Sequence, residues 1–224
     1  MIRVEKTRLD QRAPVSVFAP RHIRDDQIQA FLKQNVEWIR RKITEVRRAH
    51  DSLGSKRFAS GEEFLFLGRK HRLEVRDHPE EKSRVGFDGR KWDVSLPAIL
   101  PHGERPGRIR KELVSWYQGQ AREILAGRVF HYARLMGLTP KNITVKAQKT
   151  IWGSCHYRRR TINLNWKIIM APFPVIDYVV VHELCHLKVP NHSPMFWRKV
   201  EDILPDYRER KKWFKANAPN MALP

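Results

Sequence analysis

The chain has 224 residues, 41% of them hydrophobic, and its 44 Lys and Arg against 24 Asp and Glu leave a net charge of +20. This length suits one large or two small globular domains, and the sequence contains no internal repeat or low-complexity segment. Two cysteines are too few for a disulfide framework, and we find neither a secretory leader nor a run of transmembrane length. We therefore expect a cytoplasmic protein without a membrane span.

The first half of the chain is predicted to be strand-rich. Ile2 to Leu9 and Val15 to Phe18 alternate as strands that pair in a hairpin, and Asp25 with Asp26 begins an amphipathic helix whose apolar positions continue to Val46. Asp88–Gly89 is a tight-turn signal. It lies within a predicted meander of four strands, Phe64 to Leu67, His71 to Arg76, Arg84 to Phe87 and Trp92 to Leu96.

The second half is predicted to be mainly helical. A connector rich in Pro and Gly, residues 97–107, leads into a long helix from about Arg108 to Met136, which Gly137 ends. Two strands follow, Ile143 to Gln148 and Thr161 to Trp166. A further helix comes directly after them.

That helix contains the most informative motif, HELCH at residues 182–186. Positions four apart lie on one helical face, so His182 and His186 can reach one metal ion, with Glu183 beside them. The surrounding run, Asp177 to Val189, is apolar enough to be buried. An unpaired buried carboxylate between two imidazoles would cost several kcal/mol, which favours a bound metal over polar groups satisfied within the core.

A third ligand is predicted a few residues later. Pro190 ends the helix, and Ser193 before Pro194 is typical of the cap of a new one, so His192 falls in a tight turn beside the site. Three neutral imidazoles would leave one position of a zinc ion open, as in catalytic sites. The alternative is a histidine of an ordinary surface loop.

Glu183 would then act as general base, taking a proton from the water that zinc activates. The group that stabilises the oxyanion is not determined by the sequence, which offers four candidates: Tyr178, His156, Tyr157 and Tyr207. Cys155 and Cys185 are expected in the core or behind the ligands, since neither belongs to a CxxC pair.

The run HELCHLKVPNHSPMFW, with WGSC at 152–155 and INLNWKII at 162–169, resembles the YgjP-like metallopeptidase family, which is related to the SprT-like zincins. The resemblance continues through FLKQNVEWIRRKI at 31–43 and LGRKHRLEV at 67–75. It implies zinc (Zn²⁺) as cofactor, His182, His186 and His192 as its ligands, and Glu183 as the general base.

The resemblance also implies an α+β fold in two parts. Residues 1–105 would form a β-rich N-terminal subdomain with one long amphipathic helix. Residues 106–224 would form a small zincin-like, minigluzincin-type catalytic subdomain, in which the HExxH helix lies beside a short sheet.

Three functions are compatible with these features. The first is a zinc metallopeptidase that acts on a peptide or protein laid along Ile162 to Trp166, with Trp152, Asn165 and Arg158 as candidate substrate contacts. The second is a metal-dependent nucleoside triphosphate pyrophosphatase, an activity also attached to the family. The third is a basic nucleic-acid-binding protein with structural zinc, since the excess charge favours polyanions unless it is simply a solvated surface. The Arg158–Arg160 triplet either flanks the cleft or is a solvated hairpin tip. The oligomeric state does not follow from the sequence.

Overall fold

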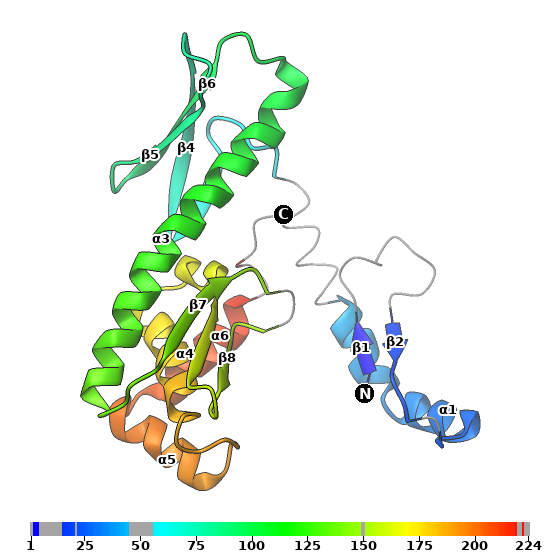
Figure 1. Cartoon of the computed structure of the whole chain (residues 1–224). Coiled ribbons are helices and arrows are strands. Elements are labelled where there is room, and N and C mark those ends of the chain that lie inside the picture. The colour runs from blue at the N-terminus through cyan, green and yellow to red at the C-terminus, as the bar shows by residue number, and fades with distance from the viewer. Residues whose placement is uncertain are drawn as a thin grey trace. The chain divides into compact units, whose positions relative to one another are not determined.

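The structure is a computed structural model that describes residues 2–4, 15–20, 22–44, 56–148, 151–218 and 221 (Figure 1). The chain divides into two compact units, Met1–Lys56 together with Pro224, and Arg57–Leu223. The subdomain boundary predicted between residues 105 and 106 falls inside the second unit and stays a prediction. None of the helices in the described ranges is long and apolar enough to cross a membrane.

The first unit contains a short hairpin and a helix. Strand β1 (Ile2–Val4) pairs antiparallel with β2 (Val15–Val17), as predicted, while residues 5–14 lie outside the described ranges. Helix α1 (Asp25–Gln34) starts at the predicted aspartates, but it ends at Asn35, whose side-chain amide donates to the Phe31 carbonyl at 2.8 Å. Helical residues resume at 36–44. The predicted single helix is thus interrupted, because the Asn side chain competes for a backbone carbonyl.

The second unit begins with a four-stranded sheet: β3 (Glu63–Phe66), β4 (Arg69–His78), β5 (Arg84–Phe87) and β6 (Lys91–Pro97). The predicted meander is wrong, because the strand order is β3-β4-β6-β5 and β4 runs parallel to β6. The reason is burial. Strand β6 is the most apolar of the four, with Trp92, Val94 and Leu96 fully buried, and it therefore takes a central place.

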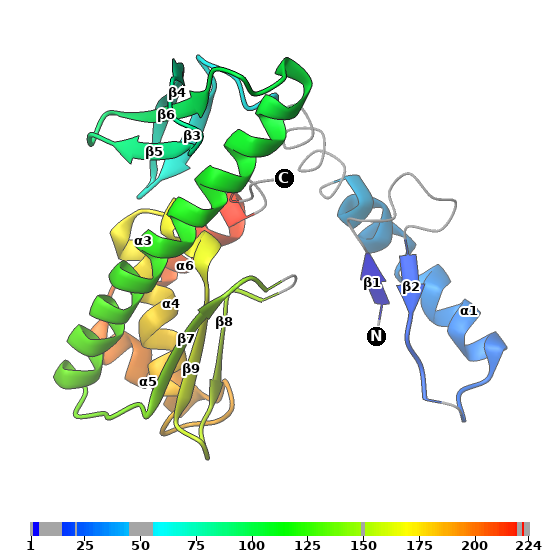
Figure 2. The same ribbon diagram turned by 45° about the horizontal axis from the view of Figure 1, so that its top comes forward.

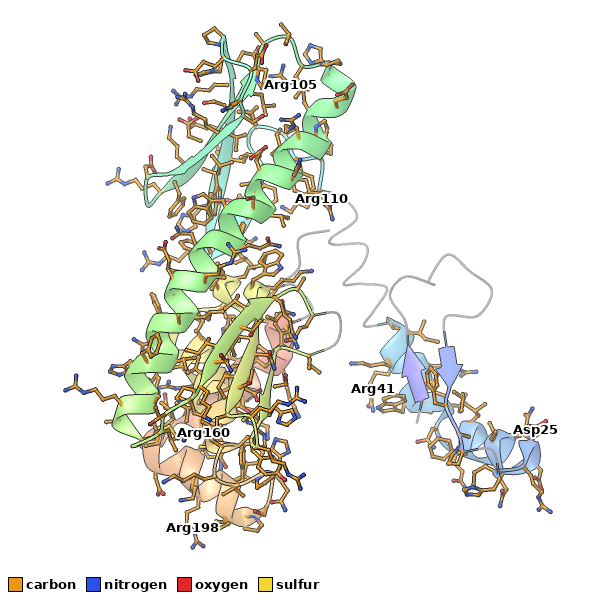
Figure 3. All side chains as sticks on the ribbon, in the orientation of Figure 1. Asp25, Arg41, Arg105, Arg110, Arg160 and Arg198 are labelled. Atoms are coloured by element: carbon orange, nitrogen blue, oxygen red, sulfur yellow. The ribbon has the colours of Figure 1, made fainter. Side chains whose placement is uncertain are left out.

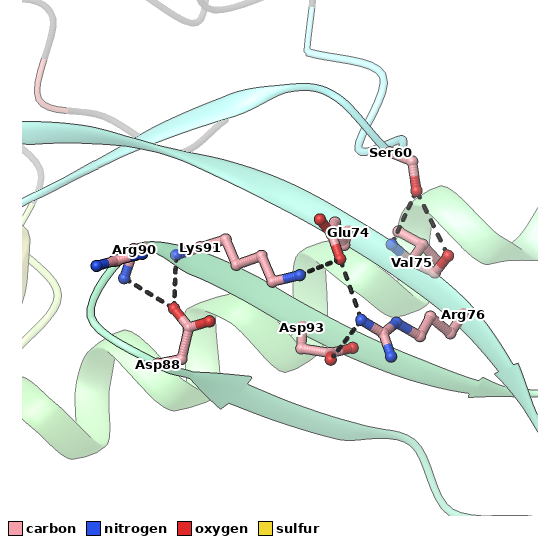
Figure 4. A network of polar contacts seen from close by, with 8 residues as sticks. All are labelled: Ser60, Glu74, Val75, Arg76, Asp88, Arg90, Lys91 and Asp93. Atoms are coloured by element: carbon pink, nitrogen blue, oxygen red, sulfur yellow. Dashed lines mark hydrogen bonds and ion pairs between the residues drawn. The ribbon is translucent and has the colours of Figure 1, made fainter.

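The opposite face of this sheet is polar (Figure 4). Lys91 Nζ donates to Glu74 Oε2 at 2.6 Å, and the Arg76 guanidinium lies 3.1 Å from the same oxygen and 3.4 Å from Asp93. The predicted tight turn is present, since Asp88 Oδ1 accepts the backbone N–H of Lys91 at 2.9 Å. These pairs keep the solvent side of the sheet charged on both strands.

Helix α3 (Arg105–Leu135) follows a 3-10 turn, η2 (His102–Glu104), and starts three residues earlier than predicted. One stripe of this helix is buried at intervals of four residues: Ile109, Leu113, Tyr117, Ala121, Leu125 and Val129. This stripe packs on β5 and β6 near its start and on β7 and α4 further along (Figure 2). Gly137, with φ +60°, allows the turn that ends it.

A three-stranded sheet comes next: β7 (Asn142–Lys146), β8 (Gly153–His156) and β9 (Thr161–Asn165). Its order is β7-β9-β8, so β9 is hydrogen-bonded on both sides, and β7 and β8 are the two edge strands (Figure 2). We had expected a substrate to lie along Ile162–Trp166, but no further strand can pair with β9. Trp166 is buried and begins the 3-10 helix η3 (Trp166–Met170).

Three helices complete the unit: α4 (Phe173–Cys185), α5 (Pro194–Ile203) and α6 (Tyr207–Asn217). The β3–β4 turn fixes the start of α4, because Leu67 N–H donates to the Ile169 carbonyl at 2.8 Å and Gly68 N–H to that of Met170 at 3.0 Å. Gly68 has φ +82°, and a Cβ there would lie 2.8 Å from Cβ of Pro172. Only glycine fits this contact without strain. The predicted α+β class is confirmed.

Candidate metal centre

Helix α4 carries the motif in the interior of the second unit. Nearly all its residues from Val175 onward are buried, so the helix is held by packing on every side. Its one early charge, Asp177, is bound by Arg128 of α3 through two hydrogen bonds of 2.6 and 2.8 Å, and by the Tyr132 hydroxyl at 3.0 Å. This clamp fixes α4 five residues before His182.

The three predicted ligand histidines come together. His182 lies in the last turn of α4, and His186 caps that helix. His192 lies in the turn before Ser193, which is the N-cap of α5, as predicted. One nitrogen from each ring falls within 4.8 Å of the others, and Nε2 of His182 lies 2.9 Å from Nε2 of His192. The Pro190 stop thus brings the third imidazole back to the other two.

Aromatic side chains hold the imidazoles in place. The ring of Phe196, fully buried, stacks on His186 with centroids 4.5 Å apart, and the Trp197 ring stacks on His192 at 5.6 Å. The Tyr207 ring of α6 stacks in turn on the Trp197 ring, with centroids 5.5 Å apart. Helices α5 and α6 therefore orient the three histidines, although they contain none of them.

Burial favours the neutral form, which metal binding requires, for the two imidazoles on or next to α4, His182 and His186. Burial, followed by the neighbouring His186 and His192, lowers the pKa of His182 to about 3. Burial also lowers the pKa of His186, although its Nδ1 is hydrogen-bonded to the Val189 carbonyl at 3.0 Å. That bond places the proton of a neutral ring on Nδ1 and leaves the lone pair on Nε2.

The residues fit a divalent metal. The lone pairs of His182 and His192 repel each other at 2.9 Å unless they share a proton or a cation. Two imidazoles on one tetrahedral zinc have nitrogens roughly 3.3 Å apart, from Zn–N bonds of about 2.0–2.1 Å, which differs little from this spacing. A donor set of three imidazoles suits zinc better than Mg²⁺, which prefers oxygen ligands.

Glu183 follows His182 in the chain and lies against strand β8. Its side chain is 6% exposed, and burial raises its pKa to about 8. A Cβ on Gly153 would lie only 2.6 Å from Oε1 of Glu183 and 2.7 Å from its Cγ. Strand β8 can therefore approach the carboxylate this closely only because residue 153 is glycine. The sequence analysis missed this role, although a glycine inside a strand is itself a signal of close approach.

Of the predicted substrate contacts, Trp152 and Asn165 are neighbours, because the Asn165 N–H donates to the Trp152 carbonyl at 2.8 Å, whereas Arg158 lies elsewhere. Trp152 packs its ring against Phe214 of α6 with centroids 5.4 Å apart. Asn165 is 3% exposed, and its amide donates to the carbonyls of Gln148 at 2.8 Å and Ile151 at 3.2 Å. Its side chain therefore supports the loop before β8. Arg158 is exposed at the tip of the β8–β9 hairpin.

Two of the four oxyanion candidates are buried near the histidines, and the other two are exposed away from them. Tyr178 is buried one helical turn before His182, with ring centroids 5.9 Å apart. Tyr207 is also buried and reaches the site through Trp197. His156 and Tyr157 are exposed at the far end of β8 from Gly153.

Comparison with known families decides the assignment. The model described as "YgjP-like, metallopeptidase domain" matches residues 6–217. The chain belongs to the YgjP-like family. The resemblance predicted from the sequence is thereby confirmed, and the protein is of a metallopeptidase class.

Other comparisons add less. No curated protein matches this YgjP-like chain. Among solved structures it is similar to the metallopeptidase zymogen of Pyrococcus abyssi abylysin, with 23% identity over 44% of this chain and 99% of that one. The TM-score of 0.39 is too low to establish a common arrangement of the two chains.

Proposed function

We propose that this YgjP-like protein is a zinc-dependent metallopeptidase in which His182, His186 and His192 hold the metal and Glu183 is the general base. The observation that carries the proposal is the convergence of three imidazole nitrogens within 4.8 Å, with a buried carboxylate on the adjacent helical position. A site that only stabilised the fold would have no use for a carboxylate that is not a ligand.

The bound zinc would supply Lewis-acid activation of water and of the substrate carbonyl. Glu183 takes one proton from the attacking water as its oxygen bonds to the carbonyl carbon. The C–N bond then breaks, and Glu183 delivers that proton to the leaving nitrogen. Tyr178, one turn before His182, is the candidate best situated to donate a hydrogen bond to the carbonyl oxygen.

The substrate would bind as an extra strand. Strand β8 is one of the two edges of the three-stranded sheet, and it is the edge whose first residue, Gly153, lies against Glu183. An extended peptide can hydrogen-bond to such an edge and so present its backbone carbonyl to the site. The edge of β8 thus takes the substrate-binding role that we had expected of β9, which is already paired on both sides.

A nucleoside triphosphate pyrophosphatase remains the second candidate from the sequence, but the ligand set argues against it. Phosphoryl transfer enzymes usually hold Mg²⁺ through carboxylates and phosphate oxygens. The metal-binding group found among the described residues contains only imidazoles. Peptide hydrolysis on zinc is therefore the better match.

The test is Glu183→Gln, with Glu123→Gln on the exposed face of α3 as the matched control. Zinc content is measured by mass spectrometry, and cleavage is followed on denatured casein and a peptide library. We expect Glu183→Gln to keep stoichiometric zinc and to lose about 10²–10⁴-fold in kcat. Wild-type cleavage by Glu183→Gln would refute the proposal, as would triphosphate hydrolysis without any peptide cleavage in the wild type.

A further inference from the structure

The sheet beside the proposed site contains no acidic residue, and the loops that join its strands are basic. No Asp or Glu occurs between Glu123 and Asp177, a stretch that includes all of β7, β8 and β9. Lys and Arg continue through the same stretch. The sheet therefore lacks the interspersed carboxylates found on the polar face of the four-stranded sheet.

The charges gather at one end of the sheet. Arg158, Arg159 and Arg160 form the tip between β8 and β9, and Lys141 N–H donates to the Arg160 carbonyl at 2.8 Å. We call these four residues the basic end. All four are exposed, and none forms an ion pair with a carboxylate within the residues that the structure describes. Figure 3 shows Arg160 at the same end of this unit as Arg198 of α5.

Strand β8 connects the basic end to the proposed site. It starts at Gly153, which touches Glu183, and runs to His156, directly before the tip. At about 3.3 Å per residue, the tip begins roughly 10–13 Å along the strand. A peptide on the free edge of β8 would therefore reach the basic end roughly three to six residues from its scissile bond.

The direction of that peptide follows from strand pairing. Antiparallel pairs are commoner and slightly more stable per residue than parallel ones. A chain antiparallel to β8 runs from the tip toward Gly153, so the residues at the basic end precede the scissile bond.

We propose that the basic end, Lys141 with Arg158–Arg160, selects peptide substrates with acidic side chains three to six residues N-terminal to the scissile bond. This inference rests on the proposed peptidase function and names its substrate class. The Arg158 guanidinium donates to the Tyr157 hydroxyl at 3.0 Å, but among the described residues none of the four cations would have to leave a carboxylate partner to bind an acidic side chain. A single-stranded nucleic acid would be drawn by the same charge, but the edge strand offers hydrogen bonds suited to a peptide backbone.

The test measures binding of labelled peptides by fluorescence anisotropy to the zinc-loaded full chain carrying Glu183→Gln. Three peptides of about 12 residues share one centre and carry a Glu block on the N-terminal side, a Gln block there, or a Glu block on the C-terminal side. We expect the first to bind about three- to tenfold more tightly than the others, with the preference shrinking in high salt.

Two double variants locate the effect. Arg158→Gln/Arg159→Gln should abolish the preference, whereas Arg69→Gln/Arg72→Gln, an equal charge loss on exposed positions of β4, should leave it intact. Arg160 is kept because its φ of +51° constrains the turn. Equal affinity for all three peptides, or an unchanged preference in the tip variant, would overturn the proposal.

Cleavage by the wild type distinguishes a failure of the proposed selectivity from a failure of the proposed peptidase function. If the wild type cleaves the Glu and Gln peptides equally, the selectivity is wrong and the peptidase function stands. If it cleaves no peptide at all, both fail. A thymidine oligonucleotide that binds more tightly than the acidic peptide, and loses that affinity in the tip variant, would identify the basic end as a nucleic-acid surface instead.

Discussion

Gly153→Ala tests whether the approach of β8 to Glu183 matters for catalysis. The new Cβ would lie 2.6 Å from Oε1, 2.7 Å from Cγ and 2.9 Å from Cδ of Glu183. Since ordinary contact begins at 3.4 Å, the strand and the carboxylate must separate by about 0.8 Å. Rotating the oxygen away does not suffice, because Cγ lies nearer the helix and is equally close.

The expected magnitude follows from that displacement. Misplacing a reacting group by about 1 Å can cost about 10²-fold in rate, so we expect kcat to fall roughly 10–100-fold. Overpacking should also destabilise the protein by about 1–3 kcal/mol. Zinc affinity should change little, because Gly153 lies against Glu183, the proposed general base, and not against the three proposed ligands.

The assay combines kcat and KM on a cleaved peptide with zinc affinity and urea unfolding. Gly119→Ala is the matched control, since nothing lies within 4 Å of a Cβ there, and a helical Gly replaced by Ala should gain about 0.5–1 kcal/mol. A Gly153→Ala variant that is folded, binds zinc and turns over at the wild-type rate would refute the reasoning. Loss of zinc in parallel with activity would also refute it, because the strand would then be supporting the ligands.

Three further predictions concern stability and reactivity. Asp177→Asn removes the negative charge from the partly buried pair with Arg128 and should cost about 1–3 kcal/mol in urea unfolding. A change below about 0.5 kcal/mol would contradict the clamp. Gly68→Ala should destabilise the protein by about 1–3 kcal/mol more than Gly61→Ala in the same assay. Both glycines have a positive φ, but only at Gly68 would the new Cβ meet a neighbour, Pro172. Equal losses would show that the contact with Pro172 does not matter. Burial raises the pKa of the Cys155 thiol from 9.0 to about 12, so its thiolate fraction at pH 8 is about 10³-fold lower than that of an ordinary cysteine. Iodoacetamide should therefore label Cys155 slowly until the protein unfolds. Rapid labelling of the native protein would show that the thiol is not in this buried environment.

Local signals in the sequence predicted most of the site. The spacing of His182 and His186, the proline after them and the Ser193–Pro194 cap are all rules about neighbouring residues, and the structure follows each one. The same holds for the Asp88–Gly89 turn. Such signals succeed because the atoms that enforce them lie within a few residues in the chain.

The errors concerned pairing between distant segments. The parallel register of Leu73 with Trp92, and the central position of β9, depend on which strand buries most apolar surface. Neither pattern can be read from one strand alone, since alternation of polar and apolar residues fixes a face but not a neighbour. The contact of Gly153 with Glu183 joins residues 30 positions apart and was missed for the same reason.

The free edge of β8 has a consequence for self-association. An unpaired strand edge is a template for any extended chain, including the same strand of a second copy, and is a common starting point for aggregation. Two copies that approached edge to edge would bring their arginine tips together, on molecules that each carry +20. Repulsion between like charges opposes that encounter, whereas an acidic chain is attracted. The basic end would therefore oppose pairing between two copies of β8 while attracting the acidic substrates that we propose.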